Sequence, residues 1–89
     1  MKEKLSIEER KEIMAESNPD MLFADGLDDA LIGVAERACK ETVAVYDRQK
    51  CIRVLMKQKM TEEEAVEYFE FNTVGAWMGE NTPIFITKI

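Results

Sequence analysis

The chain of 89 residues contains no histidine and only two cysteines, Cys39 and Cys51. Without histidine the usual general base at neutral pH is missing, and a cysteine nucleophile would lack its usual partner. The spacing of the two cysteines fits no zinc motif. We therefore expect no catalytic residue, no metal and no cofactor, and two buried free thiols, with a disulfide as the alternative.

Long apolar runs are also missing. No stretch reaches the roughly 18 consecutive apolar residues that a membrane-spanning helix needs. The first residues, Met1 to Ser6, lead into a charged segment rather than into the apolar core of a secretory signal. We therefore expect a cytoplasmic protein with no membrane partner.

Basic residues are outnumbered, with 12 Lys and Arg against 18 Asp and Glu, which gives a formal net charge of -6. An acidic surface opposes binding to phosphate backbones, so we expect no nucleic-acid partner. The basic residues also dilute the acidic ones, and this does not favour a mimic of DNA.

The hydrophobic pattern predicts one α+β domain over residues 1–89. Ser6 with Glu9, and Thr61 with Glu64, each have the spacing of a capping box at a helix start. We expect helices near 6–16, 47–58 and 61–75, strands near 30–37, 42–46 and 83–87, and a hairpin loop at Lys40-Glu41. The simplest layered arrangement is a small three-stranded antiparallel sheet covered on one face by two helices. The N-terminal helix, within 1–19, is expected to be peripheral to a core formed by 20–89.

The second and third predicted helices have opposite charge. Residues 48–59 contain five basic and no acidic residues, whereas residues 62–70 contain five acidic and no basic residues. Cys51, Ile52, Leu55 and Met56 share one face of the second helix, and Cys51 is expected to be a buried free thiol on this apolar face. We hypothesise a homodimer in which the basic helix of one chain faces the acidic helix of the other. The alternative is a monomer with two solvated helix faces.

Four groups of residues could form a binding site, and each has a structural alternative. The acidic turn around Asp28 lacks the ligand pattern of an EF-hand, so its alternative is a solvated turn. Asp47, beside Tyr46 at a strand end, is also suited to capping a helix. The Glu70-Phe71-Asn72 amide could bond a neighbouring backbone, and Trp77 with Tyr68, Phe71 and Met78 could be interface or core. The candidate binding residues are Asp28, Tyr46, Asp47, Asn72, Trp77 and Glu80.

Several short strings in this chain resemble a family of small proteins of unassigned function from bacteriophage and prophage genomes. The strings are Asp25-Gly26-Leu27-Asp28-Asp29-Ala30-Leu31-Ile32-Gly33, Val45-Tyr46-Asp47, Lys50-Cys51-Ile52, Glu70-Phe71-Asn72, Gly75-Ala76-Trp77, Gly79-Glu80 and Thr82-Pro83. The resemblance covers roughly residues 20 to 86. Arg48 departs from it, because acidic or aromatic residues are more usual there. The resemblance implies a phage accessory factor that acts on a protein in the cytoplasm of a bacterial host.

Three functions are consistent with the sequence. The first is a non-enzymatic phage accessory protein that binds and modulates a bacterial or phage protein, which predicts an exposed apolar patch. The alternative is a module that binds and sequesters a small molecule or nucleotide, which predicts a concave pocket. The third is a small enzyme that uses carboxylates, which predicts carboxylates of raised pKa in such a pocket.

Overall fold

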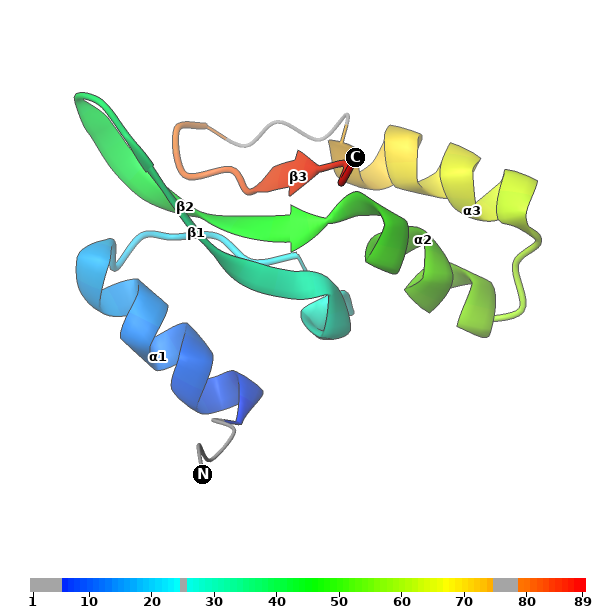
Figure 1. Cartoon of the computed structure of the whole chain (residues 1–89), viewed down its shortest axis with the longest axis horizontal. Helices are drawn as coiled ribbons and strands as arrows, with labels where there is room; N and C mark the ends of the chain where they lie inside the picture. The colour runs from blue at the N-terminus through cyan, green and yellow to red at the C-terminus, as the bar shows by residue number, and fades with distance from the viewer. Residues whose placement is uncertain (1–5, 25, 75–78) are drawn as a thin grey trace.

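Within the residues that the structure describes, the helices and strands form in the predicted order, so the α+β class is confirmed (Figure 1). The computed structural model describes residues 6–24, 26–74 and 79–89. The elements are α1 (Ile7–Ser17), a 3-10 turn η1 (Asp28–Ala30), β1 (Leu31–Arg37), β2 (Lys40–Asp47), α2 (Arg48–Lys57), α3 (Glu62–Phe69), a π-helical turn η2 (Glu70–Val74) and β3 (Ile84–Ile86).

All three helices begin at a side-chain cap. The Glu64 N–H donates to Thr61 Oγ1 at 3.2 Å, and the Glu64 carboxylate accepts from the Thr61 N–H at 2.9 Å. Ser6 forms the same capping box at α1, and Asp47 caps α2 by accepting from the Lys50 N–H. These caps were predicted correctly because each joins residues only three positions apart.

The sheet is mixed, and the prediction of an antiparallel sheet is wrong. β1 pairs with β2 antiparallel, but β3 pairs with β2 in parallel, with Val45 opposite Ile84 and Asp47 opposite Ile86. The connection from β2 to β3 contains α2, α3 and η2, so it is long enough to bring the chain back for a strand that runs in the same direction as β2. Parallel pairing needs such a crossover, whereas antiparallel pairing can use a tight turn.

The turn between β1 and β2 lies at Ala38-Cys39 rather than at the predicted Lys40-Glu41. Arg37 pairs with Lys40, so Lys40 and Glu41 already belong to β2. Cys39 has a φ of 60°, in the left-handed region that non-glycine residues rarely adopt. A cysteine there gives no turn signal in the sequence, which is why the loop was placed too late.

The core lies where the sheet meets the segments packed against it. Tyr46 and Phe85, on neighbouring strands, have ring centroids 5.5 Å apart, and Phe69 of α3 meets Phe85 edge to face at 5.1 Å. Cys51 is a fully buried free thiol, as predicted, whereas Cys39 is exposed, contrary to prediction. The buried cluster consists of Met14, Met21, Leu27, Ala30, Leu31, Ala44, Tyr46, Cys51, Ile52, Leu55, Ala65 and Phe69.

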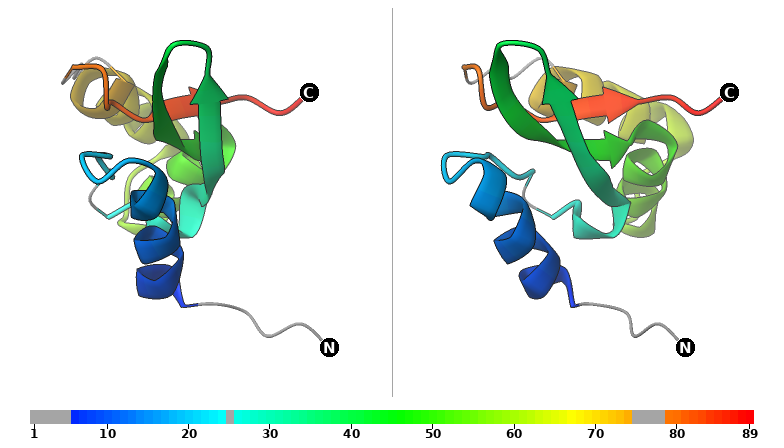
Figure 2. Two further views of the ribbon diagram at one scale, coloured as in Figure 1. Left: turned by 90° about the vertical axis from the view of Figure 1, so that its left-hand side faces the viewer. Right: turned by 60° about the vertical axis from the view of Figure 1, so that its left-hand side comes forward.

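The helices lie in two different places around the sheet (Figures 1 and 2). α2 and α3 form a helical hairpin beyond the end of β2, and the predicted packing of both over one sheet face is not confirmed. α1 lies beside the β1–β2 hairpin, where Met14 enters the core and Arg10 Nη2 donates to the Leu31 carbonyl at 2.7 Å. Among the described residues, no helix is long and apolar enough to span a membrane.

Candidate protein-interaction surface

Of the predicted binding residues that form ion pairs, Asp28 and Glu80 do so in different parts of the fold. Asp28, in η1, lies 2.8 Å from Lys11 Nζ of α1. Glu80, before β3, lies 3.0 Å from Lys40 Nζ near the strand turn, and this hydrogen bond lowers the pKa of Glu80. Trp77 is outside the described residues. The two ion pairs tie loops to neighbouring elements, and neither carboxylate faces the other.

Tyr46 and Asp47 are both buried in structural roles. The Tyr46 hydroxyl accepts from the Ala24 N–H at 2.8 Å, which fastens the segment before η1 to β2. Burial acts to raise the pKa of Asp47, but the hydrogen bond from the Lys50 N–H and the charge of Lys88 hold it below its ordinary value. A buried, ionised cap with two partners has little capacity left for a ligand.

Asn72 is exposed, and the aromatic residues beside it are exposed as well. Its side-chain amide donates to the Tyr68 carbonyl at 3.2 Å, so it bonds its own helix rather than a neighbouring loop. Phe71 is 83% exposed and Tyr68 is 46% exposed. The core alternative is therefore wrong for these two aromatic residues, and the interface alternative is favoured.

Helix geometry explains which aromatic side chain faces inward. Ala65 and Phe69 are four residues apart, share one face of α3, and are both fully buried. The Arg48 guanidinium lies 5.2 Å from the Phe69 ring centroid and 2.8 Å from the Glu70 carboxylate. This contact closes the inner face, and Phe71, two residues after Phe69, is directed outward. The signal was present in the sequence as the i, i+4 spacing of the two buried residues.

The π-helical turn η2 is the second unusual feature of this segment. Such turns are rare and occur frequently at functional sites. A wider turn also changes the angle at which the residues after α3 project. The turn therefore contains Phe71, which is the most exposed aromatic side chain among the described residues.

Acidic side chains border the aromatic pair. Glu62, Glu63, Glu64 and Glu67 line an open depression together with Val66. Within the described part of the chain, none of these four carboxylates forms an ion pair with Lys or Arg. We name the set of Glu63, Glu67, Tyr68 and Phe71 the aromatic–acidic surface.

Nothing matches this chain among the family models, the curated proteins or the solved structures with which it was compared. The resemblance to phage proteins therefore stays a prediction, and the surface is interpreted from its own chemistry.

Neither a metal site nor an activated thiol lies beside this surface among the residues described. No group of three or more Cys, Asp or Glu there could hold a metal ion. Burial, and then the negative charge of Asp47, raise the pKa of the Cys51 thiol to about 12. Cys51 is thus a protonated core residue at neutral pH.

Proposed function

We propose that this chain is a non-enzymatic phage accessory protein that binds and modulates a bacterial or phage protein through the aromatic–acidic surface. The observation that carries the proposal is the 83% exposure of Phe71 next to the half-exposed Tyr68. A phenylalanine that leaves most of its ring in water gains from burial against a partner. Aromatic residues are also enriched among the residues that contribute most to binding.

The charges on α3 indicate the chemistry of the partner. Glu63 and Glu67 are exposed and unpaired within the described residues, so an arriving basic side chain would displace no internal ion pair. An arginine could pair with these carboxylates and stack on Tyr68 or Phe71. The partner surface we propose is an apolar pocket with a basic rim.

A photo-crosslinking residue at position 71 tests the proposal in bacterial cells. The Phe71→benzoylphenylalanine variant should give one discrete adduct with a foreign protein. The matched control carries the same residue at Ile13, which is 53% exposed on α1, a helix that lies apart from α3 (Figure 1). The adduct should weaken when Glu67→Lys is added, because the basic rim of the partner is then repelled.

Two outcomes count against the proposal. A yield of adducts at position 71 no greater than at position 13 would mean that the aromatic residues are simply solvated. An adduct of twice the mass of the chain, with no foreign adduct, would mean that position 71 meets another copy instead.

A further inference from the structure

Charges are separated along the α2–α3 hairpin. Lys50, Arg53 and Lys57 are exposed on α2 at the spacing of one helix face, and Glu63 and Glu67 are exposed on α3 at the same kind of spacing. Among the described residues, the ion pair that joins α2 to the segment directly after α3 is Arg48–Glu70, with Glu70 in η2. The remaining charges of both helices are therefore open to an external partner.

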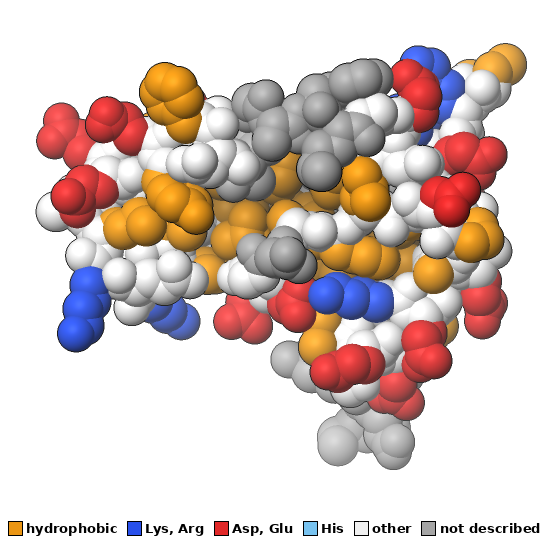
Figure 3. All heavy atoms as spheres, turned by 180° about the vertical axis from the view of Figure 1, so that it is seen from behind, with side chains coloured by type: hydrophobic (Ala, Val, Ile, Leu, Met, Phe, Trp, Pro, Cys, Tyr) orange, Lys and Arg blue, Asp and Glu red, His pale blue; other side chains and the backbone are white. Residues whose placement is uncertain are grey.

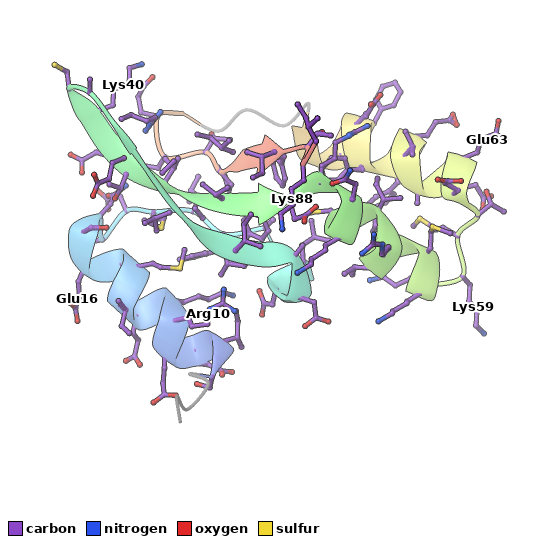
Figure 4. The ribbon with its side chains drawn as sticks, in the orientation of Figure 1. Arg10, Glu16, Lys40, Lys59, Glu63 and Lys88 are labelled. Carbon is purple, nitrogen blue, oxygen red and sulfur yellow. The ribbon has the colours of Figure 1, made fainter. Side chains whose placement is uncertain are left out.

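The two rows of charge cannot neutralise each other within one chain because they point in opposite directions. At the closed end of the hairpin, Lys59 and Glu63 point away from each other, toward opposite edges (Figure 4). From behind, acidic side chains gather at one edge of this end of the molecule and Lys or Arg side chains at the other (Figure 3). Apolar side chains lie between them.

The side chains of this central strip have a composition that suits a protein–protein contact. Val54, Met60 and Val66, from α2, the turn and α3, pack against the core but remain partly exposed. A strip of moderate apolar area with charged rows on both sides has the anatomy of an interface, with its apolar centre and polar rim.

We propose that the α2–α3 hairpin binds the same hairpin of a second copy about a two-fold axis that runs parallel to the helices. Such a rotation places the basic row of each copy against the acidic row of the other. A two-fold axis across the helices would instead place acidic on acidic and basic on basic. The parallel axis also brings α2 against an α3 that runs antiparallel to it, as in up-and-down helix bundles.

The proposal shares Glu63 and Glu67 with the aromatic–acidic surface, but it does not use Phe71, so Phe71 crosslinking and sedimentation test the two proposals separately. Exposed ion pairs are individually weak and are screened by salt. Each copy also carries a formal charge of -6, which opposes association. We expect the dissociation constant of the dimer to be about tenfold higher at roughly 0.5 M salt than at roughly 0.05 M salt, where the Debye length is longer.

Two charge-reversed variants test the geometry by sedimentation. One carries Arg53→Glu with Lys57→Glu, and the other carries Glu63→Lys with Glu67→Lys. Each variant alone should be monomeric, since the α2 row of one copy and the α3 row of the other, which face each other across the axis, then carry charges of the same sign. A mixture of the two should form a one-to-one dimer, because both contacts across the axis are again between opposite charges.

The control separates local pairing from overall charge. Glu8→Lys with Glu12→Lys changes the net charge as much as the α3 variant does, but on exposed positions of α1. This variant should remain dimeric at low salt, and circular dichroism checks that each variant is folded.

Three results would overturn the proposal. They are a monomeric parent chain at low salt and high protein concentration, folded variants that do not associate when mixed, and a dimer that neither reversal affects. None of these bears on a foreign adduct at position 71, so the two proposals can fail separately.

Discussion

Asn18 and Asn81 are joined side chain to side chain, with Asn18 Nδ2 2.8 Å from Asn81 Oδ1. The Asn18 amide also donates to the Thr42 carbonyl at 2.8 Å, and its oxygen accepts from the Asp20 N–H at 3.0 Å. Asn18 is only 2% exposed. One buried amide thus connects the end of α1, the start of β2 and the segment before β3.

Replacing Asn18 should therefore destabilise the fold. Asn18→Ala leaves the Thr42 carbonyl and the Asn81 amide without their buried donor, which costs about 1–3 kcal/mol of unfolding free energy. Urea denaturation followed by circular dichroism measures the loss. Glu16→Ala, at an exposed position of α1, is the control and should change the stability by less than about 0.5 kcal/mol. Equal effects of the two substitutions would contradict a bridging role for Asn18.

The two thiols should differ in reactivity. Cys39 is exposed, whereas Cys51 is fully buried and its pKa is raised to about 12. At about pH 8, a thiol reagent should modify Cys39 rapidly and Cys51 only on unfolding, because the thiolate is the reacting form. Cys39→Ser should abolish the rapid phase. A second thiol that reacts at the rate of the denatured chain would show that Cys51 is accessible.

The strand turn should be stabilised by glycine at position 39. Cys39 adopts a φ of 60°, which costs a residue with a Cβ more than it costs glycine. After allowance for the greater freedom of glycine in the unfolded chain, Cys39→Gly should raise the unfolding free energy by about 0.5–1 kcal/mol. Ala38→Gly is the matched control, since Ala38 is not among the residues of positive φ, and it should not stabilise the chain. A loss of stability in Cys39→Gly would indicate that the thiol makes a contact of its own.

The charge of Asp47 should make stability depend on pH on the acidic side. The pKa of Asp47 in the folded chain is below its ordinary value, because the Lys50 N–H and the Lys88 charge outweigh the effect of burial. Its contribution is therefore present above about pH 4, the ordinary value of an aspartate, and is lost as the pH falls through the lower folded pKa. Asp47→Asn keeps a capping side chain but removes the charge.

The measurement for Asp47 is the difference in unfolding free energy between the parent chain and Asp47→Asn at a series of pH values. The parent should be the more stable at neutral pH, and the difference should shrink as the solution becomes acidic. A difference that does not change with pH would assign the effect to packing. Glu80→Gln is a useful comparison, since the Lys40 hydrogen bond also lowers the pKa of that exposed carboxyl.

The parts of the fold that could be predicted are those that depend on short-range interactions. The caps at Ser6, Asp47 and Thr61 involve bonds over three residues, and the buried spacing of Ala65 and Phe69 follows from helix geometry. Only part of the candidate surface could be predicted from the sequence. Tyr68 and Phe71 were recognised as a possible interface, but burial of an aromatic side chain depends on what packs against it, which the local pattern does not contain.

The sequence by itself determined the α+β class, the order of the elements and the opposite charges of the two central helices, because these follow from periodicity, capping and composition. Only the tertiary structure decided that β3 lies parallel to β2, that Cys39 forms the turn, and that Phe71 stays in water while Phe69 is buried. These outcomes depend on contacts between residues far apart in the chain, such as Tyr46 with Phe85 and Asn18 with Asn81. Such contacts form only once the long connection through α2 and α3 has brought its two ends together.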